Sequence, residues 1–306
     1  MSDLILHHYD GSPFAHKIRV IFGLKNLAWK SVDIPMIMPK PDLMPLTGGY
    51  RRTPVLQVGA DIYHDTELIA AEIERRHPEP TIYPEGGVGM AHALSCWADQ
   101  NLFGASTSAV FAHIADKMPP AFFADRSAMR GQEPPPAEKI MAAAPRLVAE
   151  LNRSLDLIEG WLGDGRQFLL GDAAGLADFS VFHPVWMLTR TGKKNAALLE
   201  PFPNVQAWLG RLDALGAGDR TEMDSKDALA VAQQTEPDDP GESAPDAAGP
   251  AVGQKVTVMS ADKVPEPVVG DVVAVRLNEV VVRREDDQVG TIHNHFPRFG
   301  YMIRPA

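Results

Sequence analysis

The first 34 residues constrain the fold of this chain more than any other segment, because a helical pattern lies between two short apolar runs. Residues 3–8 and 29–34 are short and mostly apolar, which is typical of buried strands. Between them, residues 13–25 repeat apolar side chains with the spacing of a helix. A strand, a helix and a second strand in this order predict a βαβ unit at the start of the chain.

The segment after this unit has the pattern of a β-hairpin followed by another helix. After a proline-rich loop, "TPVLQV" and "DIYH" are typical of two strands joined by a tight turn at Gly59. A helix is then expected to begin at Asp65 or Thr66 and to end near His77, where prolines follow. This order of elements is that of a thioredoxin-like α/β domain, which we place at residues 1–80.

The next region, residues 88–216, is predicted to be an all-α domain. Helical periodicity covers most of it, and we expect long helices over 89–117, 137–163, 176–191 and 203–215. The segment between the first two of these helices is rich in proline. We therefore expect an irregular connection or a short helical turn there.

The composition changes after residue 218. Residues 219–250 contain nine acidic side chains and two basic ones, and this Pro-rich segment is predicted to be a mobile linker with one short helix. Beyond it, "KVTVM", "DVVAVR", "EVVVRR", "VGTIHN" and "GYMIR" are typical of five strands. Residues 251–306 are therefore expected to form a small all-β domain, either a barrel or a sandwich.

The charge of the chain narrows the classes of partner. Its formal charge is −11 and its isoelectric point is about 5.4, whereas nucleic acids and anionic membranes are bound by clustered Lys and Arg. We therefore expect neither nucleic acid nor membrane as a partner. A lone cysteine, Cys96, excludes an intramolecular disulfide, and no apolar run has the length of a membrane span. Both features favour a cytoplasmic protein.

Three short stretches of the thioredoxin-like region carry side chains that suit ligand binding. Ser12 precedes a proline at the start of the first helix, where free N–H groups and the helix dipole favour an anion such as a thiolate. Thr53 precedes Pro54, where a cis peptide bond would expose the backbone of Thr53. Asp65 and Thr66 would hold the charged ends of an amino acid. Taken singly, each stretch is better explained by structure alone, as a helix cap or a trans proline.

Taken together, these stretches resemble the glutathione transferase family, and its serine-type and omega-like classes most closely. The sequence "SPFAHK" falls where that family keeps its thiol-activating residue, "TPVL" matches its cis-proline turn, and "DT" matches the pair that binds the γ-glutamyl end. The stretch "FLLGDAAGLADFSVF" resembles the start of the core helix of the family's second domain. Two residues depart from the pattern: Gly175 stands in place of Ser or Thr, and Asp65 in place of the commoner Glu or Gln. The resemblance covers residues 3–216.

The resemblance implies an enzyme that activates the thiol of glutathione for attack on a small electrophile bound between the two domains. Ser12 would be catalytic, because its hydroxyl would stabilise the thiolate. The implied glutathione-binding residues are Ser12, Phe14, Arg52, Thr53, Pro54, Asp65 and Thr66, with Lys40 as a further cation for the glycyl carboxylate. The electrophile pocket would be lined by Trp97, Asn101, Phe103 and Ser108, although any one of the apolar side chains is more typical of core packing.

The resemblance also implies a homodimer, with glutathione as cosubstrate and no metal. One alternative is a non-catalytic scaffold that acts through an unknown protein partner of the β domain. Another is a specialised glutathione-dependent lyase, isomerase or dehalogenase. Because the β domain lies outside the resemblance, we expect deletion of residues 236–306 to leave glutathione binding in place.

The remaining reactive side chains are interpreted structurally. Cys96 lies in mid-helix among apolar residues, so we expect a buried or interfacial thiol and not a nucleophile. His293 and His295 alternate along a presumed strand and share one face, so they would bind a metal only with a third ligand. No residue of the sequence can be identified as that ligand. A polar surface or a partner contact is therefore the prediction for these two histidines.

Overall fold

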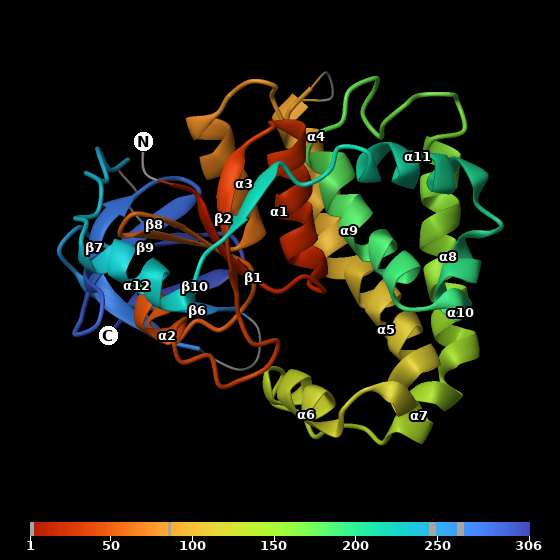
Figure 1. Ribbon diagram of the computed structural model, residues 1–306, viewed down its shortest axis with the longest axis horizontal. Coiled ribbons are helices and arrows are strands. Elements are labelled where there is room, and N and C mark those ends of the chain that lie inside the picture. The colour runs from red at the N-terminus through yellow and green to blue at the C-terminus, as the bar shows by residue number, and fades with distance from the viewer. Residues whose placement is uncertain (1–2, 85–86, 245–248, 262–265) are drawn as a thin grey trace.

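The computed structural model describes residues 3–84, 87–244, 249–261 and 266–306. Strands gather at one side of the molecule and most helices at the other (Figure 1). Parts of the expected linker, residues 245–248, and of the expected β domain, residues 262–265, lie outside the described residues.

The amino-terminal region is thioredoxin-like, as predicted. Strand β1 pairs in parallel with β2 and antiparallel with β3, and β3 pairs antiparallel with β4. Apolar side chains of these strands and of α1 are buried, which explains why the short runs fold as strands around a helix. The elements are β1 Ile5–His8, α1 Pro13–Leu24, β2 Ala28–Asp33, α2 Met44–Thr47, β3 Val55–Val58, β4 Asp61–His64 and α3 Thr66–Arg76.

The second region is helical, also as predicted, with three differences in detail. The helix expected over 137–163 is divided in two by a turn at Ala143. The long helix expected over 89–117 is interrupted by a π-helical turn, and the proline-rich segment contains a nine-residue helix, α6. Two prolines stand at its start, where they fit a helix and do not break it. The elements are α4 Gly87–Trp97, η1 Ala98–Leu102, α5 Phe103–Ile114, η2 Ala115–Lys117, α6 Pro120–Ala128, α7 Ala137–Ala142, α8 Ala144–Trp161, α9 Leu176–Arg190, α10 Lys193–Ala196, η3 Ala197–Leu199 and α11 Pro203–Asp213.

The buried core helix α9 begins with half of a capping box. The Asp178 carboxylate accepts hydrogen bonds from the backbone N–H groups of Gly175 (3.1 Å) and Leu169 (2.8 Å) and from the Trp208 indole (2.9 Å). A side chain at position 175 would place its Cβ 2.6 Å from Cδ of Pro84. Glycine therefore replaces the usual Ser or Thr because the chain approaches too closely for a Cβ atom.

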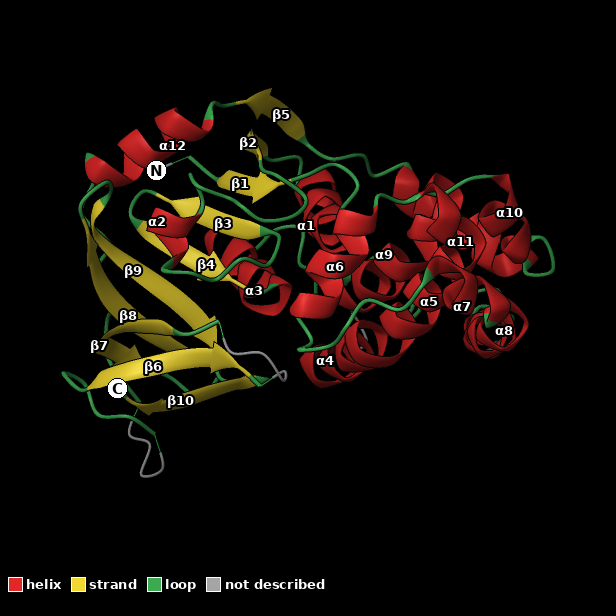
Figure 2. Cartoon of the chain, turned by 90° about the horizontal axis from the view of Figure 1, so that it is seen from below, coloured by secondary structure: helices red, strands yellow, loops and turns green. Residues whose placement is uncertain are grey.

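The carboxy-terminal region contains the five predicted strands, and they extend the thioredoxin-like sheet. Strand β9 pairs in parallel with β4, so one ten-stranded sheet runs in the order β10-β6-β7-β8-β9-β4-β3-β1-β2-β5 (Figure 2). The predicted helix of the linker also forms, capped by Asp224, and packs on β9 and β2. The elements are β5 Asp219–Glu222, α12 Ser225–Gln233, β6 Lys255–Ser260, β7 Val268–Val275, β8 Glu279–Asp286, β9 Gly290–Pro297 and β10 Tyr301–Pro305.

One hydrophobic core is shared between the thioredoxin-like strands and the carboxy-terminal strands. Ile5, Val32 and Ile62 belong to the same buried cluster as Val280 and Phe296. Part of the acidic segment also contacts the sheet, because the Asp238 N–H donates a hydrogen bond to Asp61 Oδ2 at 2.8 Å. The carboxy-terminal strands are thus part of the body of the protein, and not a module on a free tether. No helix among the described residues combines the length and the apolar character needed to span a membrane.

Candidate functional site

Ser12 lies at the end of β1 and caps α1. Its Oγ accepts a hydrogen bond from the Ala15 N–H at 3.2 Å, and Pro13 occupies the first helical position. Only 2% of Ser12 is exposed. Its hydroxyl hydrogen stays available as a donor while the oxygen serves as the cap. An anion held there would also face the positive end of the helix dipole.

The peptide bond between Thr53 and Pro54 is cis, as the resemblance implies. Beside it, the buried Lys40 Nζ donates to Thr53 Oγ1 (3.0 Å) and to the Arg51 carbonyl (2.8 Å). Burial, together with the neighbouring cations Arg126 and Arg51, lowers the pKa of Lys40 to about 8. Lys40 therefore holds its charge at neutral pH in a place where an added anion would be favourable.

Asp65 and Thr66 begin α3. The Asp65 Oδ1 accepts a hydrogen bond from the Glu67 N–H at 3.1 Å, and Asp65 has a positive φ of 71°. Thr66 is 4% exposed. Burial raises the pKa of the Asp65 carboxyl, while Lys17 and Arg52 act in the opposite direction. A cationic group bound at Asp65 would relieve this penalty.

Two side chains of the carboxy-terminal region, one in β10 and one just before β7, reach the same region, and sequence reasoning missed both. Tyr301 Oη lies 3.4 Å from Asp65 Oδ2. Glu266 lies 3.6 Å from Arg51 Nε and 3.9 Å from Arg52 Nε. No local motif marks these residues, because their position depends on how the added strands join the sheet.

The residues predicted for a second pocket do not all lie together. Phe103 contacts Phe14, with ring centroids 4.6 Å apart, so α5 meets α1 close to Ser12. Trp97 instead packs against Trp161 in the helical region, at 5.5 Å. Asn101 is exposed and Ser108 is half-buried. Of the four predicted pocket residues, Phe103 is the one with a described contact to the first helix.

A buried charged network lies at the junction of the two regions. Lys17 of α1 donates to Asp99 at 3.1 Å, and Asp99 also bonds His183 of α9 at 2.8 Å. Asp99 belongs to the π-helical turn, a feature that often accompanies function. Cys96 lies one turn away and is half-buried, and burial raises the pKa of its thiol, which does not suit a nucleophile.

One hollow of the described structure lies away from Ser12. It measures about 820 Å³ and lies among the carboxy-terminal strands. Arg276, Phe299, Tyr301 and Arg304 are among its lining residues, whereas Ser12 is not. Chemistry and not volume therefore identifies the region around Ser12 as the candidate site.

Comparisons with known proteins identify the family of the two amino-terminal regions. Residues 6–81 match the family description "Glutathione S-transferase, N-terminal domain", and residues 141–211 match "Glutathione S-transferase, C-terminal domain". A probable glutathione S-transferase of Oryza sativa subsp. japonica is 25% identical over 236 residues, which is 73% of this chain and 90% of the relative.

Solved structures extend the likeness to the whole chain. A GST-like protein from Pseudomonas syringae is 37% identical, covers 100% of both chains and has a TM-score of 0.78. A glutathione S-transferase from Rhodospirillum rubrum F11 is 20% identical, with a TM-score of 0.54 over 69% of this chain and 88% of its own. This second likeness concerns the fold alone. The match to the Pseudomonas protein thus includes the carboxy-terminal region of this chain.

Proposed function

The chain belongs to the glutathione S-transferase family, and from this premise we propose that it binds glutathione and activates its thiol for attack on a small electrophile. The observation that carries the proposal is Ser12 at the amino end of α1, with its oxygen held by the Ala15 N–H. The O–H would then donate to the sulfur of bound glutathione. Ser12 is the proposed catalytic residue, and the nucleophile is the sulfur of glutathione.

Ser12 acts by stabilising charge. A hydrogen bond to a charged partner is stronger than one between neutral groups, so donation by the Ser12 hydroxyl lowers the pKa of the bound thiol. The amino end of α1 adds a favourable dipole. Because Ser12 is buried, water competes little for this hydrogen bond.

The two ends of glutathione are assigned to the groups around Ser12. The γ-glutamyl ammonium pairs with Asp65, and its carboxylate is held by Thr66 and the N–H groups that begin α3. The backbone of Thr53, ahead of cis-Pro54, pairs with the cysteinyl residue. The full proposed binding set is Ser12, Phe14, Arg52, Thr53, Pro54, Asp65 and Thr66, with Lys40 as a second cation for the glycyl carboxylate.

The electrophile is proposed to bind where the helical region meets α1. Phe103 and Phe14 offer an apolar surface there. Trp97, Asn101 and Ser108 remain proposals for this pocket, as do a homodimeric assembly and a cytoplasmic location. The domain limits 1–80, 88–216, 219–250 and 251–306 likewise stay a proposal.

Calorimetric titration of the full-length protein tests this function. Glutathione and S-methylglutathione should both bind, and a panel of small electrophiles should yield glutathione conjugates. Absence of glutathione binding would overturn the proposal. Binding without any turnover would leave a non-catalytic scaffold as the better account.

Asp65→Asn should weaken glutathione binding by about 10- to 100-fold, because a hydrogen bond to a charged group contributes about 1.5–3 kcal/mol. Asparagine caps helices and tolerates positive φ, so α3 should be retained. The matched control is Asp224→Asn, which changes the cap of α12 in the same way. Equal glutathione affinity of the two variants, measured by calorimetry, would contradict the assignment of Asp65.

Glu266→Gln should strengthen glutathione binding by several-fold. The Glu266 carboxylate lies beside Arg51 and Arg52, and it would repel a glycyl carboxylate held by the same cations. Glu285→Gln is the control, since Glu285 is exposed and pairs with Arg283. The glutathione affinity of both variants can be measured by calorimetric titration. A weaker or unchanged affinity in Glu266→Gln would exclude this site for the glycyl carboxylate of glutathione.

A further inference from the structure

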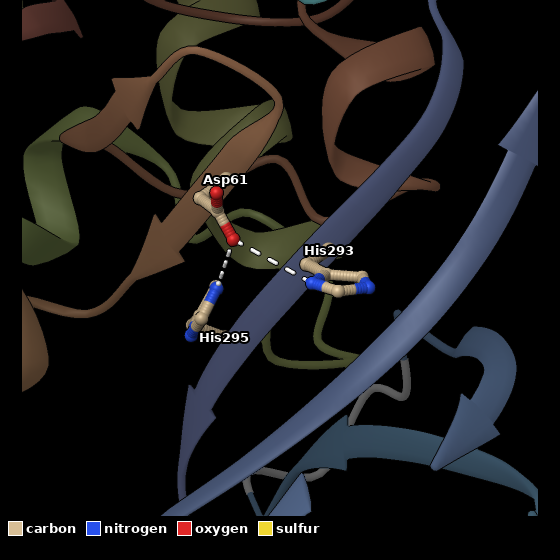
Figure 3. Close-up of side chains that lie close together, drawn as sticks. All are labelled: Asp61, His293 and His295. Atoms are coloured by element: carbon tan, nitrogen blue, oxygen red, sulfur yellow. Dashed lines mark hydrogen bonds and ion pairs between the residues drawn. The ribbon is translucent and has the colours of Figure 1, made fainter. Parts of the chain in front are cut away.

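Three potential metal ligands meet where the carboxy-terminal strands join the thioredoxin-like sheet. Asp61 begins β4 and lies directly opposite His293 of β9, while His295 follows on the same face of β9 (Figure 3). Asp61 Oδ1 lies 3.6 Å from His293 Nδ1 and 2.8 Å from His295 Nε2. One ligand atom from each residue lies within 4.8 Å of the other two. The third ligand that the two histidines lack in the sequence is thus supplied by a residue more than 200 positions away.

All three side chains are buried. Asp61 is 2% exposed, His293 6% and His295 5%. Among the described residues, His293 Nδ1 has no hydrogen-bond partner although the atom is shielded from solvent. A buried polar atom without a hydrogen bond is costly, and this nitrogen faces the Asp61 carboxylate (Figure 3). A cation between these groups would satisfy both.

We propose that Asp61, His293 and His295 bind a divalent transition-metal cation, with Zn²⁺ as the best fit. Imidazole nitrogen and carboxylate oxygen are ligands that Zn²⁺ prefers, at about 2.0–2.2 Å. Atoms bound to one tetrahedral ion at these lengths lie about 3.3 Å apart. The separation of Asp61 from His293 is already close to this value. Binding would lengthen the separation of His295 Nε2 from Asp61 Oδ1 by about 0.5 Å. It would also bring the ligand nitrogens of the two histidines, which lie within 4.8 Å of one another, to about 3.3 Å.

The surroundings of His295 are those of a metal-bound histidine. Its second ring nitrogen, Nδ1, donates to Glu279 Oε1 at 2.7 Å, which fixes the ring so that Nε2 faces Asp61. Such a carboxylate partner is the usual support of a ligating imidazole. The Tyr63 ring stacks on the His295 ring, with centroids 4.2 Å apart. Asp61 keeps its other oxygen occupied by the Asp238 N–H, which leaves Oδ1 for the ion.

The bound ion would stabilise the fold by cross-linking two strands. It joins β4 to β9, the strand pair through which the carboxy-terminal strands attach to the sheet. Three protein ligands leave a fourth position for water. The rival account is a metal-free chain of hydrogen bonds from Asp61 through His295 to Glu279. Within the described part of the chain, that account leaves His293 Nδ1 without a hydrogen bond, 3.6 Å from Asp61 Oδ1, whereas a metal would bind this nitrogen.

Metal titration of the full-length chain tests the proposal. Protein stripped with a chelator and dialysed should bind about one equivalent of Zn²⁺, raise its melting temperature on binding, and give a visible ligand-field spectrum with Co²⁺. His293→Ala should lose affinity by about 100-fold or more, because even outer-shell changes cost 10- to 100-fold. It keeps the hydrogen bonds of His295, so circular dichroism should be unchanged.

The matched control is His92→Ala. His92 Nδ1 also lies 3.6 Å from a carboxylate oxygen, that of Glu67, but it belongs to no cluster of three ligands among the described residues. This variant should bind Zn²⁺ as the wild-type protein does. Failure of the wild-type protein to bind Zn²⁺, or equal binding by His293→Ala, would overturn the proposal. Neither result depends on glutathione binding, so the two proposals can fail separately.

Discussion

Deleting residues 236–306 should abolish folding of the remaining chain. The deletion removes β6 to β10, which leaves β4 as an unpaired edge and uncovers apolar side chains of the shared core. The free energy lost with that burial should exceed the free energy of unfolding of a typical domain, which is about 5–15 kcal/mol. Size-exclusion chromatography and circular dichroism of the truncated chain should report aggregation without cooperative unfolding. The sequence alone predicts that the truncated chain keeps glutathione binding. The shared sheet and core lead to the opposite expectation.

Two phenylalanines three positions apart, one buried and one exposed, test the shared core by single substitutions. Phe296 is 1% exposed and stacks on His64 at 4.2 Å, whereas Phe299 is 61% exposed. Phe296→Ala should cost about 3–5 kcal/mol in the free energy of unfolding, and Phe299→Ala at most about 0.5 kcal/mol. Urea titrations measure both. A soluble truncated chain with normal glutathione affinity, or equal losses in the two variants, would contradict a shared core.

Ser12→Ala should lower kcat/KM for glutathione conjugation by about 100-fold, a typical loss when one donor to a reacting anion is removed. The substitution also removes the cap of α1, which costs about 1 kcal/mol of stability. Two controls separate these effects. Ser12→Thr keeps a hydroxyl and should keep most of the activity, while Asp224→Ala removes the cap of α12 and should leave turnover unchanged. Undiminished turnover in Ser12→Ala, measured in steady-state assays, would remove Ser12 from the mechanism.

Much of the fold could be predicted because its signals are local. The caps at Ser12, Asp65 and Asp224 follow from side chains next to the backbone that they affect. The cis bond before Pro54 is expected from the family resemblance alone, because an isolated proline favours trans. The length of helix α6 was underestimated for a local reason as well. Its prolines were interpreted as breakers, although they stand at the first turn, where proline is tolerated.

The union of the carboxy-terminal strands with the sheet could not be predicted from local pattern. Alternation along β9 correctly places His293 and His295 on one face, but it does not identify the strand that pairs with β9. Pairing with β4 depends on the packing of side chains more than 200 residues apart. The same limit hid Tyr301 and Glu266, which reach the candidate site only because β9 lies against β4.

If Ser12 stabilises the thiolate of bound glutathione, the pKa of that thiol reports this role without the later steps of catalysis. Thiolate absorbance of the glutathione complex should titrate below the pKa of free glutathione. In Ser12→Ala the bound thiol should titrate higher by about one to two units, since one unit corresponds to about 1.36 kcal/mol. An unshifted thiol in the wild-type complex, or the same titration in Ser12→Ala, would contradict the account.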